Sequence, residues 1–288
     1  MTMTCFLKDC VFFMTRTNKN HTLSESENIM NKTELEKNLK TDYLGKPLIY
    51  TDCVDSTNNE IKRLAQKGYP TGTTVIAEKQ TSGKGRLGRV WNSPVGTGLW
   101  FSFLLRPHTD FSQISGITLA AGLGVCRAVR SFTGLDAEIK WPNDIIIGNK
   151  KICGILVETA AETDKLKYAV VGIGINVNTR VFPDEIKEKA TSLIIENKYS
   201  AINRTKLFKE ILFHTEKCID DYLKNPVIPN DYKQLCATLG RNISVRRGKN
   251  VINGIASDIS ENGDLIATDE NHNKILINSG EVTVQGIY

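Results

Sequence analysis

A glycine-rich, basic segment is the first candidate for chemistry in this chain. Residues 83–89 read Gly-Lys-Gly-Arg-Leu-Gly-Arg. Glycine lets a backbone approach a ligand closely, and the cations Lys84, Arg86 and Arg89 can neutralise phosphate or carboxylate oxygens. The segment also matches G-x-G-x-x-G, but Pro94 denies the helix that a dinucleotide-binding loop must open. We therefore predict an anion-binding loop, with a solvated basic turn as the alternative.

A second group of candidate residues surrounds a predicted hairpin. Residues 140–144 read Lys-Trp-Pro-Asn-Asp, and the Gly-Asn pair at 148–149 is a strong two-residue turn signal. The lysine pair 150–151 then precedes an apolar strand that Gly154 interrupts. Glycine within a strand often marks the close approach of a ligand or of another backbone segment. A plain turn followed by an exposed lysine pair is the alternative.

Alternating glycines mark a third group. Residues 170–178 read Val-Val-Gly-Ile-Gly-Ile-Asn-Val-Asn, so Gly172 and Gly174 share one face of an otherwise β-branched strand that Asn176 closes. A face without side chains can receive a planar ring. Packing against another backbone segment would explain the same glycines equally well.

The surrounding pattern predicts the elements that position these groups. Strands are expected at 48–54, 74–78, 98–106, 138–141, 144–147, 152–158 and 168–177, and helices at 32–39, 57–68, 113–132 and 203–223. Thr57-x-x-Glu60 predicts a capping box, and Gly134 is typical of a residue that follows a helix. The segment 179–200 fits no element. Beyond residue 240 a small all-β barrel is expected, with strands at 242–247, 251–257, 265–268, 274–278 and 281–285.

Composition bounds the class of protein. A length of 288 residues suggests about two domains, and 40% hydrophobic with 24% charged residues excludes collagen-like and wholly disordered chains. A net charge of +5 is too small to indicate a nucleic-acid binder. Seven cysteines without a C-x-x-C pair argue against zinc ribbons and disulfide frameworks. No apolar run approaches the roughly 18 residues of a membrane span. We therefore expect a cytoplasmic protein without a membrane partner.

The same reading divides the chain into three parts. Residues 5–14 are apolar except for Lys8 and Asp9, and residues 18–28 are polar and patternless. We predict that residues 1–29 are a disordered extension, with a targeting or interaction arm as the alternative. Residues 30–237 are expected to form the α/β domain that holds the three groups. Residues 238–288 are expected to form the small β-domain.

With these groups in this order, the chain resembles the biotin–protein ligases, the biotin–[acetyl-CoA-carboxylase] ligase family. The resemblance runs from about residue 32 to residue 285 and includes Asp55-Ser56-Thr57-Asn58 and Gln80. It implies an α/β (α+β) catalytic domain with a mixed sheet of the class II synthetase type, followed by an SH3-like barrel. It also implies two reactions. The carboxylate of biotin attacks the α-phosphate of ATP, which yields biotinyl-5′-AMP and pyrophosphate. A lysine of a biotin carboxyl carrier protein then attacks the mixed anhydride and releases AMP.

The resemblance further implies roles for individual residues. Lys151, Arg86 and Lys84 are the expected catalytic residues, with Lys151 bridging the biotin carboxylate and the α-phosphate. Asp144 is the expected Mg²⁺ ligand, since Mg²⁺ takes one or two carboxylates plus phosphate oxygens. Biotin-binding roles are implied for Ser56, Thr57, Asn58, Gln80, Gly83, Lys84, Gly85, Arg86, Lys151, Gly154 and Gly172. Roles in binding ATP or the adenylate are implied for Arg86, Arg89, Trp91, Lys140, Asn143, Asp144, Lys151, Gly174 and Asn176, with Trp91 stacking on adenine.

The chain departs from the family pattern in two places. Lys84 stands where the loop usually has arginine, which keeps the charge but loses the planar fork. Members that also repress transcription carry an N-terminal winged helix–turn–helix, and the residues before 48 show no such periodicity, so we expect no DNA partner. Two other functions stay open: a lipoate or octanoate ligase on the same fold, and a biotin-responsive transcriptional regulator. A homodimer is the remaining partner hypothesis.

Overall fold

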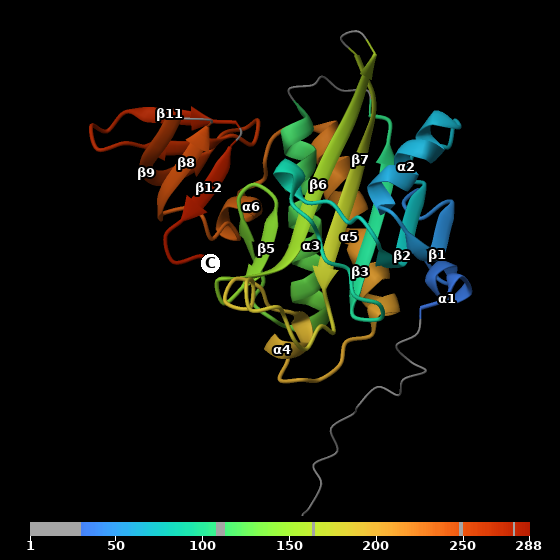
Figure 1. The fold of residues 1–288 in the computed structure, drawn as a ribbon. Coiled ribbons are helices and arrows are strands. Elements are labelled where there is room, and N and C mark those ends of the chain that lie inside the picture. Colours follow the sequence, from blue (N-terminus) through green and yellow to red (C-terminus); the bar gives the residue numbers. More distant parts are fainter. Residues whose placement is uncertain (1–29, 108–112, 163–164, 248–249, 279) are drawn as a thin grey trace, which may run out of the picture.

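The computed structural model describes residues 30–107, 113–162, 165–247, 250–278 and 280–288, and the predicted extension 1–29 lies outside them. Seven strands form one mixed sheet in the order β1-β2-β3-β7-β6-β5-β4 (Figure 1). Strands β1 and β2 pair in parallel, and every other neighbouring pair is antiparallel. The strands are β1 (Leu48–Val54), β2 (Thr74–Gln80), β3 (Gly98–Leu105), β4 (Glu138–Lys140), β5 (Asp144–Ile147), β6 (Lys150–Glu162) and β7 (Lys165–Asn176).

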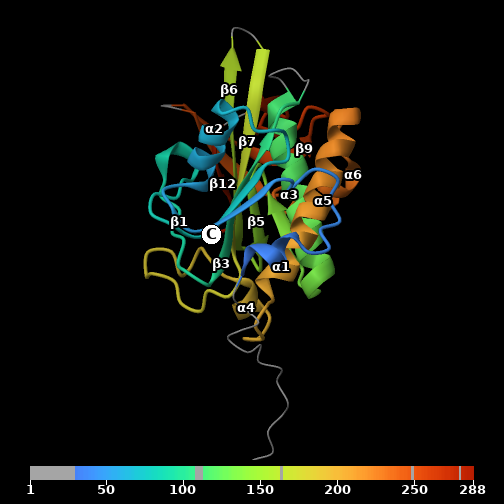
Figure 2. The ribbon, with the colours of Figure 1, turned by 90° about the vertical axis from the view of Figure 1, so that its right-hand side faces the viewer.

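Helices cover the two faces of this sheet unequally (Figure 2). The long helices α3 (Ile114–Thr133) and α5 (Arg204–Lys224) lie on one face and enclose the larger apolar core. Helix α2 (Thr57–Gln66) lies on the other face, where Ile61 and Leu64 pack against Leu104 and Val170. Three short α-helices, α1 (Lys32–Glu36), α4 (Leu193–Glu196) and α6 (Asn230–Gln234), and one 3-10 turn, η2 (Arg86–Gly88), complete the described part of the domain. Among the described helices, none is long and apolar enough to cross a membrane.

Side-chain alternation along β7 decides where the sheet is left bare. Ile173 belongs to the core beneath α3 and α5, whereas Val170 belongs to the cluster beneath α2. Because side chains alternate between faces, Gly172 and Gly174 continue the α2 face. The result is a strip of sheet without side chains beside the N-terminus of α2.

Five further strands form a separate antiparallel sheet in the order β11-β10-β9-β8-β12, which lies beside β5 and α6 (Figure 1). The indole Nε1 of Trp141 donates to the carbonyl of Gly263 over 3.0 Å and so ties this small β-domain to the larger one. The predicted order of a mixed-sheet domain followed by a small all-β domain is confirmed. The exact division at 237/238 stays a prediction. The strands are β8 (Asn242–Arg247), β9 (Asn250–Ile259), β10 (Leu265–Thr268), β11 (Lys274–Ile277) and β12 (Glu281–Val284).

Local signals predicted several turns and helix ends correctly. Gly148 and Asn149 have φ of 54° and 70°, as a two-residue hairpin turn requires. Gly134 follows α3 with φ 72°. Two short helices were missed: α4, within the segment 179–200 that fitted no element, and α6.

The predicted capping box at the start of α2 is wrong. The N-cap residue is Ser56, which makes no side-chain cap hydrogen bond. Instead, Gln80 at the end of β2 accepts from both the N–H and the Oγ1 of Thr57, over 2.9 and 3.1 Å. Glu60 pairs with Arg63 within the helix. A side chain from a neighbouring strand therefore satisfies the helix terminus, which the local sequence does not encode.

A buried carboxylate on α5 anchors the segment before β1. Glu216 accepts backbone N–H bonds from Asp42, Tyr43 and Leu44 over 2.6, 2.9 and 2.7 Å. We expect Glu216→Ala to lower the free energy of unfolding by about 3 kcal/mol, because three backbone donors lose a charged acceptor. Urea unfolding measures the loss. Asp221→Ala, at an exposed position of the same helix, should change the free energy by less than about 0.5 kcal/mol, and an equally small effect at Glu216 would contradict the prediction.

Candidate active site

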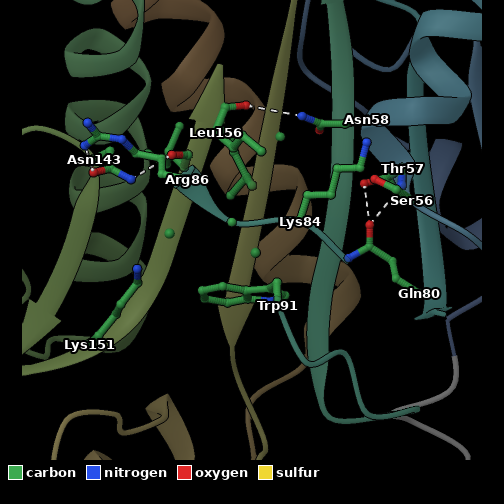
Figure 3. Close-up of a pocket in the computed structure, with 16 residues that line it drawn as sticks. Ser56, Thr57, Asn58, Gln80, Lys84, Arg86, Trp91, Asn143, Lys151 and Leu156 are labelled. Atoms are coloured by element: carbon green, nitrogen blue, oxygen red, sulfur yellow. Dashed lines mark hydrogen bonds between the residues drawn. The ribbon is translucent and has the colours of Figure 1, made fainter. Parts of the chain in front are cut away.

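The three groups of candidate residues converge on the α2 face of the sheet, at two adjoining hollows. The first is a narrow pocket of about 50 Å³ between the N-terminus of α2, the 83–91 loop and the glycine strip (Figure 3). The second is a cleft of about 710 Å³ that also reaches the small β-domain. Both are lined by Gly85, Arg86, Trp91, Asn143 and Lys151.

The predicted site residues divide between these hollows. Of the residues expected to bind biotin, the pocket brings together Ser56, Thr57, Asn58, Gln80, Lys84, Gly85, Arg86, Lys151, Gly154 and Gly172, and it also includes Gly174. Gly83 lines neither hollow; its carbonyl accepts from the N–H of Trp91 over 2.9 Å and closes the base of the loop. Of the residues expected to bind ATP, the cleft brings together Arg86, Arg89, Trp91, Lys140, Asn143, Asp144, Lys151 and Asn176.

A polar network forms one wall of the pocket. The hydroxyl of Ser102 on β3 lies 2.7 Å from Thr57 Oγ1 and 2.5 Å from Asn58 Oδ1. The amide of Asn58 donates to Glu158 over 2.7 Å. Burial alone would raise the pKa of Glu158, but hydrogen bonds from Lys62 and Asn58 bring it below its usual range. The sequence reading missed Ser102 and Glu158, because nothing in the local pattern distinguishes them from other strand residues.

The glycine strip receives side chains of the chain itself. A Cβ built on Gly172 would lie 2.1 Å from Asn58 Oδ1, and one on Gly174 would lie 2.7 Å from Cε2 of Trp91. A Cβ on Gly154, the partner of Gly174 across β6 and β7, would lie 3.0 Å from the same indole. The indole of Trp91 therefore covers Gly174 and Gly154, and the side chain of Asn58 covers Gly172. A role of these glycines in binding a ligand ring stays a prediction.

The cations of the 83–89 loop have different surroundings. Arg86 donates to Asn143 Oδ1 over 2.8 Å (Figure 3). It also donates to the carbonyl of Gly280 over 3.3 Å, and burial lowers its pKa. Lys84 is exposed, and its ammonium donates to Asn59 Oδ1 on α2 over 2.8 Å. Arg86 therefore lies where the pocket and the cleft meet, and Lys84 lies at the exposed edge of the pocket.

Two further charged groups face each other in the cleft. The ammonium of Lys151 lies 2.6 Å from Asp144 Oδ1, and Tyr288 donates its hydroxyl to Asp144 Oδ2 over 2.5 Å. The ammonium of Lys140 lies 3.5 Å from the centroid of the Tyr288 ring, and burial lowers its pKa to about 8. Burial also raises the pKa of Tyr288, so its hydroxyl stays protonated.

The segment 179–191, for which the sequence predicted no helix or strand, completes the cleft. The N–H of Lys151 donates to the carbonyl of Lys189 over 2.8 Å, and the N–H of Thr191 donates to the carbonyl of Lys151 over 2.9 Å. The amide of Asn176 donates to the carbonyl of Thr191 over 3.1 Å. The segment 179–191, which fitted no predicted element, therefore holds two predicted site residues in place.

Comparison with known proteins decides the family. A model described as "Biotin/lipoate A/B protein ligase family" matches residues 50–176, and one described as "Biotin protein ligase C terminal domain" matches residues 238–284. The chain is 37% identical over 262 residues to "Bifunctional ligase/repressor BirA" of Bacillus subtilis, which covers 89% of this chain and 80% of that protein. The chain belongs to the biotin protein ligase family.

Other members of the biotin protein ligase family agree with this result. The "Biotin--[acetyl-CoA-carboxylase] ligase" of Mycobacterium tuberculosis is 32% identical over 79% of this chain and 85% of that protein. The structure described as biotin protein ligase from Aquifex aeolicus in complex with biotin and ATP superposes with a TM-score of 0.72 at 32% identity, covering 83% of this chain and 99% of that one. The predicted family and its ligase activity toward biotin are confirmed. The roles of individual residues stay predictions.

Proposed function

We propose that this biotin protein ligase activates biotin as biotinyl-5′-AMP and transfers it to a lysine of a biotin carboxyl carrier protein. The supporting observation is that Lys151 and Arg86 line both the pocket and the cleft. A carboxylate in the first and a phosphate in the second would meet at these two cations, which cancel their mutual repulsion. Names of relatives that specify acetyl-CoA carboxylase support a carrier domain as the acceptor.

In this proposal, the pocket residues bind biotin and the cleft residues bind ATP. Thr57, Gln80 and Asn58 offer polar partners to the biotin rings. Gly172 makes room for Asn58 at the sheet, and Gly154 lines the same pocket. Trp91 stacks on adenine, and Asn176 lies where it could hydrogen-bond the base. Lys151 lies between the two reacting groups.

In this proposal the 83–91 loop moves when biotin binds. The pocket that this loop covers is narrow, with room of about 50 Å³. Leu87 and Val90 of this loop are 73% and 85% exposed, so few contacts hold its tip. A loop that closes over both substrates would also exclude water from a hydrolysable adenylate.

Asp144 could hold Mg²⁺ that arrives with ATP. The described residues contain no cluster of three or more His, Cys, Asp or Glu for a metal ion, but Mg²⁺ on a nucleotide needs only one or two carboxylates. The carboxylate of Asp144 lines the cleft and already holds one cationic group, that of Lys151, so its chemistry fits the ion. When bound, Mg²⁺ would neutralise phosphate charge.

Arg86→Gly should release the adenylate before transfer. The variant loses the cation that lies at the junction of the two hollows, so we expect roughly tenfold faster release, the effect of about one charge-assisted hydrogen bond. Mass spectrometry of a bystander protein measures the outcome as biotin on lysines outside the carrier. Leu87→Gly, in the same loop at a residue that already has φ 56°, tests for simple loop flexibility. Labelling confined to the carrier in Arg86→Gly, or equal off-carrier labelling in Leu87→Gly, would contradict the prediction.

The deciding experiment is mass spectrometry of a carrier domain after incubation with the chain, biotin and ATP. We expect one biotinyl group, absent when the acceptor lysine is changed to arginine. Lipoate or octanoate tested in parallel should give no transfer, and equal transfer would favour the alternative ligase. Specific operator binding by the purified chain would support the repressor alternative.

The proposal has two further parts. One is a cytoplasmic location, which free cysteines such as Cys126 and Cys153 favour. The other is a homodimer.

A further inference from the structure

Tyr288, in the segment after β12, contacts the charged groups of the cleft. Its hydroxyl donates to Asp144 Oδ2 over 2.5 Å, and its N–H donates to the carbonyl of Asn149 over 3.3 Å. Its ring lies 3.5 Å from the ammonium of Lys140, measured to the ring centroid. The other oxygen of Asp144 lies 2.6 Å from the ammonium of Lys151. Tyr288 therefore contacts Lys140 directly and is linked to Lys151 through the carboxylate of Asp144.

We propose that Tyr288 is a positioning residue for biotin activation. Its hydroxyl holds Asp144 so that the carboxylate directs Lys151 toward the substrates, and its ring holds Lys140 in the cleft. This inference rests on the proposed function, and it assigns to the small β-domain a part in the first reaction.

The physical argument begins with the freedom of the groups involved. Lys151 carries its charge on a flexible four-carbon stem, and its side chain is 26% exposed. A carboxylate fixed at one oxygen by a charge-assisted hydrogen bond presents its other oxygen in a defined direction. Without the bond from Tyr288, Asp144 can rotate, and the ammonium of Lys151 loses its fixed position. Misplacement of a reacting group by about 1 Å can cost 10²-fold in rate.

The segment that carries Tyr288 has an anchor other than the tyrosine hydroxyl. The preceding residue, Ile287, is 1% exposed, and its N–H donates to the carbonyl of Val284 over 3.1 Å. This residue anchors the segment in the apolar core. Tyr288→Phe should therefore remove the hydrogen bond to Asp144 without releasing the segment.

Biotin-dependent pyrophosphate exchange tests the proposal in the full chain. We expect Tyr288→Phe to lower kcat about tenfold, with the KM for biotin and the melting temperature unchanged, because the lost bond acts on the reacting groups. Tyr288→Leu should also raise the KM for ATP several-fold, since Lys140 loses its ring contact. Tyr199→Phe, at an exposed tyrosine, is the matched control and should resemble the unaltered chain.

A second measurement tests, without any catalytic turnover, whether the ring of Tyr288 covers Lys140. Trace acetylation by acetic anhydride, mapped by mass spectrometry, should modify Lys140 several-fold faster in Tyr288→Leu than in Tyr288→Phe, since only the leucine variant uncovers the 6% exposed lysine. Equal rates would overturn the role of the ring. An unchanged kcat in Tyr288→Phe would overturn the role of the hydroxyl. Absence of pyrophosphate exchange in the unaltered chain would instead overturn the proposed function, and the positioning role with it.

Discussion

Lys151→Ala should abolish biotin-dependent pyrophosphate release while the fold remains intact. The ammonium of Lys151 lies where the pocket and the cleft meet, 2.6 Å from Asp144 Oδ1 and 5.3 Å from the ring centroid of Trp91. Two anions must approach each other there, and removal of a preorganised positive group costs roughly 10²–10³-fold in kcat. We expect the upper end of this range, because the residue faces both reacting groups.

The fold should survive this change because the structural bonds of Lys151 come from its backbone. Its N–H and carbonyl hold Lys189 and Thr191, and alanine keeps both. The neighbouring Lys150→Ala is a matched control, since its ammonium lies 3.8 Å from Glu188 Oε2 and Lys150 lines neither hollow. Pyrophosphate release and thermal unfolding are measured for both variants. Near-normal release by Lys151→Ala would show that the assignment is wrong.

Gly172→Ala should weaken biotin binding. The new methyl group would lie 2.1 Å from Asn58 Oδ1, and Asn58 cannot retreat easily because it is hydrogen-bonded to Glu158 and Ser102. The wall of the pocket must therefore shift. Overpacking costs about 1–3 kcal/mol of stability. A similar cost in the pocket would lower the affinity for biotin by up to about 100-fold.

Two other glycines make this prediction specific. At Gly174 a methyl group meets the indole of Trp91, so Gly174→Ala should weaken ATP more than biotin. At Gly122, on α3, the nearest atom to a Cβ is Ile155 Cδ1 at 3.7 Å. Gly122→Ala should therefore keep full activity and gain about 0.5–1 kcal/mol of stability. Calorimetric titration with biotin alone, and then with ATP, separates the two effects. Gly172→Ala that binds biotin as the unaltered chain does would contradict the argument.

Local sequence signals predicted those features that depend on neighbours along the chain. The Gly-Asn pair at 148–149 formed the expected hairpin turn because positive φ is a property of the residues themselves. The apolar spacing at 203–223 predicted α5 (Arg204–Lys224), because that spacing is also a property of the local sequence. The same local reasoning failed at Thr57, because Gln80 on a neighbouring strand satisfies the helix terminus instead.

By itself, the sequence determined the chemical identity of the site: glycines that leave a strand face bare, a basic loop, and a lysine beside a hairpin. The tertiary structure alone decided how these parts meet. It laid Trp91 over Gly174, brought Ser102 to Asn58, and placed Tyr288 of the small β-domain against Asp144. The physical reason is that such contacts depend on strand order and on the packing of distant segments. Neither is encoded in the spacing of nearby residues.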